Sequence, residues 1–218
     1  MTIIPLTLHP RPRPTNYRPN YLMNTYKGFP TFYADSPASW REYLSKHHDE
    51  LPNTWLILQK KGSPLPGPSY EEARAEALCY GWIDSKPNKR DDDSYYLFFA
   101  RRNPKSNWSK VNKDVIAELE AAGKMAAPGR EMVRLAKETG TWDALNDVDN
   151  LVVPDDLAAA FAAAEGPARA NWDVFPPSVQ RGILEWIFNA IRPTTRQKRI
   201  EETATLAGRG ERANQFTK

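Results

Sequence analysis

The sequence predicts an α+β fold: a small antiparallel or mixed sheet of about four strands in the N-terminal half, packed with helices, followed by a helical C-terminal half. The first observation behind this prediction is that short aromatic or apolar runs typical of strands occur only before residue 108. The second is that amphipathic helical periodicity dominates after that point. With 218 residues, of which 40% are hydrophobic, the chain is long enough to bury a substantial core.

The N-terminal segment has no pattern of a folded element. Residues 1–27 contain five prolines and no acidic residue, and they show no apolar periodicity. This composition predicts a disordered extension rich in proline and arginine. The apolar start Ile3-Ile4-Pro5-Leu6 is broken by proline, and no apolar run approaches the roughly 20 residues that span a bilayer. We therefore expect a cytoplasmic protein without membrane insertion.

A strand, a helix and a second strand are expected next. Phe29–Ala34 is aromatic and alternating, and Thr54–Gln59 is a short apolar run, so both patterns indicate strands. Between them, Ser36 and Pro37 fit the N-cap and first turn of a helix. The helical spacing in this segment is carried by Trp40, Tyr43, Leu44 and His47.

The following helix and hairpin have clear boundaries in the sequence. Ser69–Glu72 is a capping box that opens a helix, and Gly81 ends it. Trp82–Asp84 and Ser94–Ala100 then indicate the two strands of a hairpin, joined by a turn rich in Lys, Asn and Asp.

Amphipathic helices account for the C-terminal half. Two of them end at Gly123 and Gly140. Pro154–Ala164 is an alanine-rich helix, Val179–Ala190 carries the strongest apolar stripe, and a last helix begins near Thr194. The remaining residues, 209–218, form a polar tail.

Composition and motifs exclude several classes of protein. Thirty Lys and Arg residues against 27 Asp and Glu give a net charge of +3, which disfavours a wholesale nucleic-acid binder. One cysteine and three histidines exclude a disulfide scaffold and a zinc site of Cys and His ligands. Glycine-rich nucleotide loops, His pairs of metalloproteases and the Gly-x-Ser-x-Gly elbow are absent. We expect neither a metal nor a cofactor.

The first candidate stretch for chemistry joins the end of one helix to a strand. Cys79 would need a histidine brought near by folding to act as a nucleophile, and its alternative role is that of a small buried hydrophobe. Asp84 is a strand carboxylate near Arg101 and Arg102 in the sequence. It could act as a general base, orient a guanidinium, or form a structural salt bridge.

The second stretch, residues 101–112, combines guanidinium, amide, hydroxyl and indole groups just before a helix. Helix starts offer free N–H groups and favour anions, and arginine adds bidentate recognition of phosphate or carboxylate. This stretch is therefore the best ligand-site candidate. The alternative is structural, with Ser106 or Ser109 only an N-cap and Trp108 only a core residue.

The third stretch, Arg192–Ile200, begins a helix with basic residues. Arg196 and Arg199 are three positions apart and share a face. Basic residues in a first turn oppose the helix dipole, so an acid or an anionic ligand is expected nearby unless the face is only solvated.

At these same residues the sequence resembles the bacteriocin-protection, OmpD-associated family, also called the YdeI type. The resemblance rests on residues 76–84, on residues 99–112, and on Thr195-Arg196 followed by Arg199-Ile200. It covers about residues 29–208 and implies a single domain of this type over 28–208. The family usually has Ala-Lys before its Pro-x-Thr-Arg segment, whereas Ile191 follows Ala190 here. The family name implies protection against antimicrobial peptides or envelope stress, but no established reaction.

Three functional hypotheses follow. The leading one is a soluble resistance-type protein that binds a small anionic ligand in a cleft lined by arginine and tryptophan. The second is a small-molecule enzyme with Asp84 as general base. The third is a weak, sequence-independent nucleic-acid or protein-interaction module, in which the net charge of +3 argues against nucleic acid. A protein partner stays open. The predicted ligand-binding residues are Trp82, Arg101, Arg102, Ser106, Trp108, Ser109, Asn112, Thr195, Arg196 and Arg199.

Overall fold

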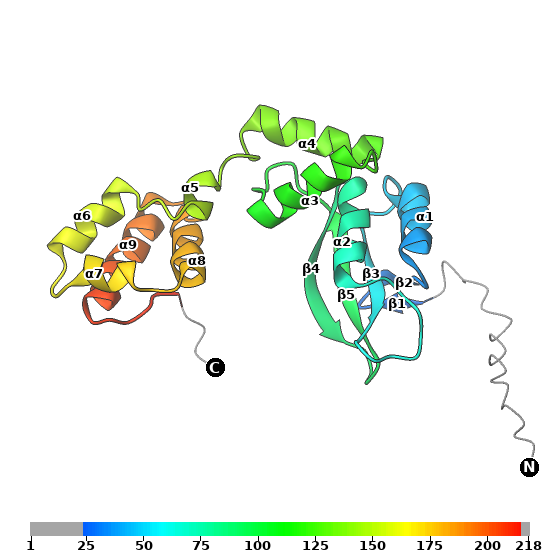
Figure 1. Cartoon of the computed structure of the whole chain (residues 1–218), viewed down its shortest axis with the longest axis horizontal. Helices are drawn as coiled ribbons and strands as arrows, with labels where there is room; N and C mark the ends of the chain where they lie inside the picture. Colours follow the sequence, from blue (N-terminus) through cyan, green and yellow to red (C-terminus); the bar gives the residue numbers. More distant parts are fainter. Residues whose placement is uncertain (1–23, 215–218) are drawn as a thin grey trace, which may run out of the picture. The chain divides into compact units, whose positions relative to one another are not determined.

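A computed structural model of the chain describes residues 24–214 and divides them into two compact units. The sheet unit comprises residues 24–77 and 82–101, and the helical unit comprises residues 78–81 and 102–214. The sequence analysis predicts a single domain over residues 28–208, whereas the structure separates the strand-rich and helical parts into two compact units. Figure 1 labels the helices and strands of both units.

The sheet unit is built on five strands in the order β1-β2-β3-β5-β4. Strands β2 and β3 are parallel, and the other three pairs are antiparallel. The strands are β1 (Thr25–Tyr26), β2 (Phe29–Tyr33), β3 (Asn53–Gln59), β4 (Trp82–Lys89) and β5 (Ser94–Arg101). The predicted mixed sheet is therefore confirmed, with one additional short strand.

Helices α1 (Pro37–His47) and α2 (Tyr70–Cys79) connect strands that run in the same direction. Both crossovers move the same way across the sheet, so right-handed connections place both helices on one face. The indole Nε1 of Trp40 in α1 donates to the carbonyl of Ala73 in α2 at 3.0 Å, which agrees with this arrangement. We call this side the helix face and the opposite side the open face.

The starts of these helices follow the sequence signals. Ser36 caps α1 through the amide of Ser39, and the capping box of Ser69 and Glu72 opens α2 with bonds of 2.8 and 3.2 Å. Both predicted N-terminal boundaries are confirmed, because a cap depends only on neighbouring residues.

The helical unit contains seven helices among the residues that the structure describes. They are α3 (Lys110–Ala121), α4 (Ala127–Thr139), α5 (Asn146–Asp149), α6 (Asp155–Ala163), α7 (Ala168–Asp173), α8 (Pro177–Phe188) and α9 (Pro193–Gly208). None of the helices between residues 24 and 214 combines the length and apolar character needed to cross a bilayer.

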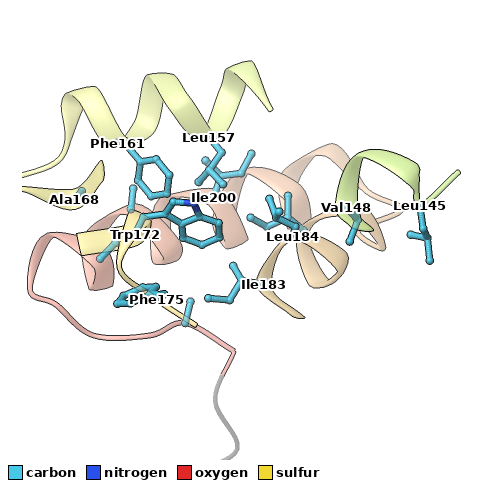
Figure 2. Close-up of a cluster of buried hydrophobic side chains, with 14 residues drawn as sticks. Leu145, Val148, Leu157, Phe161, Ala168, Trp172, Phe175, Ile183, Leu184 and Ile200 are labelled. Carbon is cyan, nitrogen blue, oxygen red and sulfur yellow. The ribbon is translucent and has the colours of Figure 1, made fainter. Parts of the chain in front are cut away.

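Helices α5 to α9 surround one hydrophobic core. Figure 2 shows Trp172 between Phe161 and Phe175. The ring centre of Trp172 lies 5.4 Å from that of Phe161 and 6.2 Å from that of Phe175. Leu157 and Ile200 from α6 and α9 complete the packing, and each is at most 1% exposed. Burial of these apolar side chains in the shared core, rather than helix propensity, stabilises helices α5 to α9.

The chain ends differ in part from the prediction. Thr25 and Tyr26 form a strand, although they fall within the predicted extension, because the turn at Lys27-Gly28 pairs them with β2. Ala213, in the predicted polar tail, is 1% exposed and belongs to the core. The rest of the predicted extension, residues 1–23, lies outside the described residues.

Candidate functional site

The structure divides the eleven residues predicted to react or to bind a ligand between the two units. The sheet unit holds Trp82, Asp84 and Arg101. The helical unit holds the other eight: Arg102, Ser106, Trp108, Ser109, Asn112, Thr195, Arg196 and Arg199.

Arg102 follows directly after β5, and the turn that leads to α3 encloses its guanidinium. The residue is 5% exposed. Its Nη2 donates to the carbonyl oxygen of Ser106 at 3.4 Å and to that of Asn107. Its Cζ lies 3.8 Å from the ring centre of Trp108, a cation–π contact. Residues 106–108 thus surround a buried cation.

The charge of Arg102 is not balanced by an acidic side chain within residues 24–214. Burial lowers its pKa to about 10, because removal from water disfavours the cation. The guanidinium is still charged at neutral pH. Its Nε is buried and has no hydrogen-bond partner in the described part of the chain. A buried cation in this state favours an anion supplied from outside the protein.

Helix α3 begins next to this guanidinium. Ser109 is its N-cap, as one of the sequence interpretations held, and its Oγ accepts from the amide of Asn112 at 3.4 Å. The carbonyl of Ser109 accepts from the amide of Lys113. The amides of Lys110 and Val111, at the first two helical positions, are therefore available to an anion.

Trp108 and Trp82, which the sequence placed along the wall of a cleft, are both core residues at 1% exposure. Trp108 packs against Trp142 with ring centres 5.0 Å apart. The indole Nε1 of Trp82 donates to the carbonyl of His48 at 3.3 Å. Trp108 contacts the predicted ligand-binding side chain of Arg102, and Trp82 is the cross-strand partner of Arg101 in the β4–β5 ladder. The two indoles therefore act by packing and not as an exposed wall.

Arg101 and Asp84 have partners within the sheet unit. The guanidinium of Arg101 donates to the backbone carbonyls of Leu51, at 3.0 Å, and Asp49. Asp84 accepts from the hydroxyl of Tyr70 at 3.1 Å instead of orienting an arginine. Burial and then the charge of Asp84 raise the pKa of Tyr70. The neighbour of the predicted general base is thus a neutral phenol, and its catalytic role stays a prediction.

Arg196 and Arg199 of α9 both bind partners within the helical unit. Arg196 forms a bidentate pair with Asp156 at 2.8 and 3.0 Å. Arg199 donates to the carbonyl of Trp186 and lies 4.9 Å from its ring centre. Thr195 is half-buried in the first turn of the same helix. No hydrogen bond, ion pair or ring contact among the described residues joins these side chains to the buried guanidinium before α3.

The pair of Asp156 and Arg196 predicts a small, acid-sensitive contribution to stability. Arg196 lowers the pKa of Asp156, so this contribution is present above the unfolded pKa of about 3.9 and is lost as the pH falls through that value and below it. Since the two side chains are 45% and 32% exposed, we expect Arg196→Gln to lower the free energy of unfolding by about 0.5–1 kcal/mol at neutral pH.

Urea unfolding of the Arg196→Gln variant at neutral pH and near pH 2 checks this expectation. The difference from the natural protein should disappear at the acidic pH. Arg169→Gln, which breaks an exposed pair with Asp173 within one helix, serves as the control and should change stability by less than about 0.5 kcal/mol. If Arg196→Gln lowered the free energy of unfolding equally at both pH values, the contribution could not come from the ion pair with Asp156.

Sequence reasoning missed three aromatic partners of these side chains. Trp142 packs on Trp108, Trp186 lies beneath Arg199, and Tyr70 donates to Asp84. None of these pairs has a helical or strand spacing in the chain, so no local pattern could have linked them.

Two family models match the chain, each over a separate segment. Residues 32–132 match a domain of unknown function, DUF8412. Residues 150–210 match the bacteriocin-protection, YdeI or OmpD-associated model. The OmpD-associated segment contains α6 to α9 and suggests a bacteriocin-protection-type function. The motif stretches at residues 76–84 and 99–112 lie inside the other match. No curated protein and no solved structure matches the chain.

Proposed function

We propose that this bacteriocin-protection-type protein acts by binding a small anionic group, such as a phosphate, beside Arg102 at the start of α3. The observation that carries the proposal is the buried guanidinium of Arg102, which has no acidic partner among residues 24–214. Its unpaired Nε and the first amides of α3 are the donors that an anion requires.

The surroundings favour an anion over a neutral ligand. Residues 99–113 contain five basic side chains and no acidic one. Lys105 in this segment is exposed and Ser106 is partly exposed, so they could attract and contact the anion at the surface, whereas Lys110 is paired with Asp114 at 2.7 Å. Arg196 and Arg199 are not part of this site, because Asp156 and Trp186 already engage them.

Thermal unfolding with increasing inorganic phosphate tests the site. We expect phosphate to stabilise the natural protein, by about 2.7 kcal/mol at 100 times the dissociation constant. The Arg102→Gln variant should lose this phosphate-dependent gain. It should also be less stable by about 1–3 kcal/mol without phosphate, because the carbonyls of Ser106 and Asn107 lose their donor.

Arg101→Gln is the matched control, since it removes the neighbouring arginine, which is exposed and belongs to the sheet unit. Its phosphate response should equal that of the natural protein. Equal responses of both variants, or no response of the natural protein to phosphate, pyrophosphate or citrate, would overturn the proposal. Circular dichroism confirms that each variant is folded before the titration.

A further inference from the structure

The open face of the sheet carries a layer of aromatic side chains that the proposed function does not use. The register of the strands places Phe29, Tyr33, Trp55, Tyr96 and Phe98 on this face, opposite the side covered by α1 and α2. Tyr26 from β1 joins them, because it pairs with Phe29 and contacts Trp55 at 5.2 Å between ring centres. We call these six residues the ring layer.

Five of these six rings, those of Tyr26, Phe29, Trp55, Tyr96 and Phe98, are joined by ring contacts across four strands. Tyr26 and Tyr96 stack at 4.1 Å with an angle of 14° between their planes. Phe98 meets Trp55 at 4.7 Å and Phe29 at 5.6 Å, both edge to face. Phe29 is 40% exposed, and Tyr26, Tyr96 and Phe98 are half-buried. The layer is thus an ordered aromatic surface that is only partly covered.

Polar atoms on the same face lack partners. Trp55 Nε1, Asn88 Nδ2 and Asn53 Oδ1 are buried and have no hydrogen-bond partner within residues 24–214. Asn88 pairs with Tyr96 across the sheet, and Asn53 pairs with Ala100, so both stand at open-face positions. The three atoms offer two donors and one acceptor. These atoms are buried, so a ligand would reach them only if the neighbouring rings rotated, and side-chain rotamer changes of this kind are common at interfaces.

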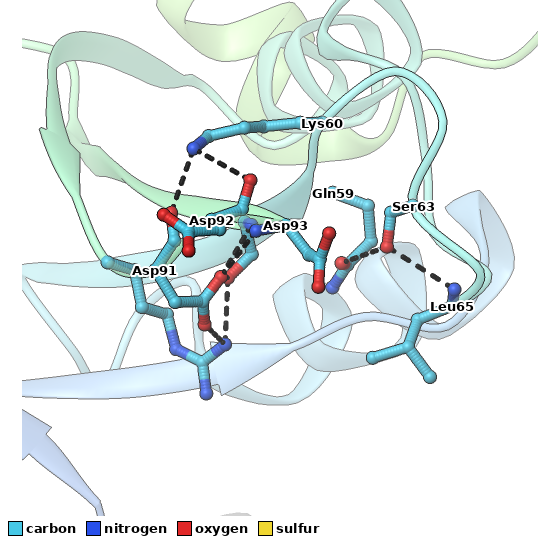
Figure 3. A network of polar contacts seen from close by, with 9 residues as sticks. Gln59, Lys60, Ser63, Leu65, Asp91, Asp92 and Asp93 are labelled. Atoms are coloured by element: carbon cyan, nitrogen blue, oxygen red, sulfur yellow. Dashed lines mark hydrogen bonds and ion pairs between the residues drawn. The ribbon is translucent and has the colours of Figure 1, made fainter.

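An acidic turn adjoins the ring layer at the end of the hairpin formed by β4 and β5. Lys60 holds this turn by donating to the carbonyls of Asp91 and Asp92 at 2.8 and 3.1 Å (Figure 3). Arg90 connects the turn to the layer, because it pairs with Asp91 and lies 5.9 Å from the ring centre of Tyr96. The carboxylates of Asp92 and Asp93 are exposed and form no ion pair among the described residues.

An extended, proline-rich chain that carries arginines has the chemistry to bind this face. It matches the ring layer, the unpaired N–H donors of Trp55 and Asn88, and the exposed carboxylates of the turn. Such a chain favours the polyproline II conformation, lays its prolines on aromatic rings and leaves its carbonyls without internal partners. Indole and amide N–H groups are the donors that those carbonyls need, and arginines pair with carboxylates. A nucleic acid fits less well, because the carboxylates of Asp92 and Asp93, which form no ion pair among the described residues, would repel its phosphates.

We propose that the open face binds the proline-rich stretch of this same chain, His9-Pro-Arg-Pro-Arg-Pro-Thr-Asn-Tyr-Arg-Pro19. This stretch carries four prolines and three arginines and no acidic residue. The prolines contact the ring layer, and the arginines pair with Asp92 and Asp93.

The position of this stretch in the chain permits the contact. The described residues begin at Asn24, two positions before Tyr26 of the ring layer. Residues 19–23 can span up to roughly 17 Å when extended. Three strand spacings separate β1 from β5, a distance of roughly 15 Å. The stretch can therefore lie across the whole face from the point where the described chain starts.

The test uses the full chain in which Pro10, Pro12, Pro14, Arg11, Arg13 and Arg18 are replaced by serine, together with a fluorescent peptide of residues 9–19. Fluorescence anisotropy should show that the peptide binds this substituted chain at least about tenfold more tightly than the natural chain. The reason is that the natural chain presents its own stretch at a high effective concentration and excludes the peptide.

Two neighbouring tyrosines give a matched pair of variants in the substituted chain. Tyr96→Ala removes a ring of the layer and should weaken peptide binding about fivefold or more. Tyr95→Ala removes the adjacent ring on the helix face and should change binding less than about twofold. Asp92→Asn combined with Asp93→Asn should weaken binding and remove most of its dependence on salt.

Several results would overturn the proposal. They are the absence of peptide binding to the substituted chain, equal effects of Tyr95→Ala and Tyr96→Ala, or equal affinity of the natural and substituted chains for the peptide. Binding of single-stranded DNA lost in Tyr96→Ala, or self-association lost in that variant, would assign the face to a nucleic acid or to a second copy instead. Tyr96→Phe, which keeps the ring, should retain peptide binding and guards against a folding defect.

Discussion

Replacing Gly129 with alanine is expected to destabilise the helical unit by about 3 kcal/mol, the upper end of the usual cost of overpacking. Gly129 lies in the first turns of α4, against the backbone of Leu78 and Cys79 at the end of α2. A methyl group at this position would lie 2.8 Å from the carbonyl oxygen of Leu78 and closer still to the carbonyl of Cys79. Neither backbone group can rotate away, so α4 would have to move.

Gly182 in α8 provides the control for this experiment. It also lies within a helix of the helical unit, but a methyl group there would meet no atom within 4 Å. Gly182→Ala should therefore stabilise the protein by about 0.5–1 kcal/mol, because alanine loses less backbone entropy on folding. Chemical denaturation of both variants measures the two effects, and a loss of similar size in each would contradict the close approach at Gly129.

The second large effect is expected for Trp40→Ala in the sheet unit. Trp40 is fully buried, and its ring centre lies 5.3 Å from the ring centre of Phe99 and 5.5 Å from that of Tyr43. Its truncation removes these contacts and the hydrogen bond to Ala73 that joins α1 to α2. We expect a loss of about 3–5 kcal/mol in the free energy of unfolding.

Leu65→Ala is the control for Trp40, because Leu65 is an apolar residue of the same unit that is 55% exposed. It should change stability by less than about 0.5 kcal/mol. Urea unfolding followed by circular dichroism measures both variants. A loss for Trp40→Ala below about 1 kcal/mol would show that α1 does not depend on this side chain for its place on the sheet.

The local elements of the fold could be predicted because their signals lie within a few residues. The N-cap at Ser36, the capping box at Ser69 and the helix stop at Gly140 are found where the sequence placed them. Of the two N-caps that the sequence offered before α3, Ser106 and Ser109, the structure has Ser109. Helix α5 and helix α7 were missed, because each is six residues or shorter and too short to show a period.

The site was predicted only in part. The sequence selected Arg102 and the start of α3, yet it also grouped them with Arg196 and Arg199, which have partners of their own in α6 and α8. A sequence shows that a residue is basic, but it does not show which carboxylate or carbonyl the folded chain brings to it. For that reason neighbouring Arg101 and Arg102 were treated alike, although one is exposed and the other is buried.

The amino-acid sequence by itself determined the α+β class, the main helices and strands with their caps, and the resemblance confirmed for residues 150–210. Those features depend on periodicity, composition and short motifs, which are local properties of the chain. Only the tertiary structure decided that Arg102 is a buried cation without an acid among the described residues, and that one face of the sheet gathers six aromatic rings. Burial and charge balance depend on residues distant in the sequence, so no local pattern could reveal them.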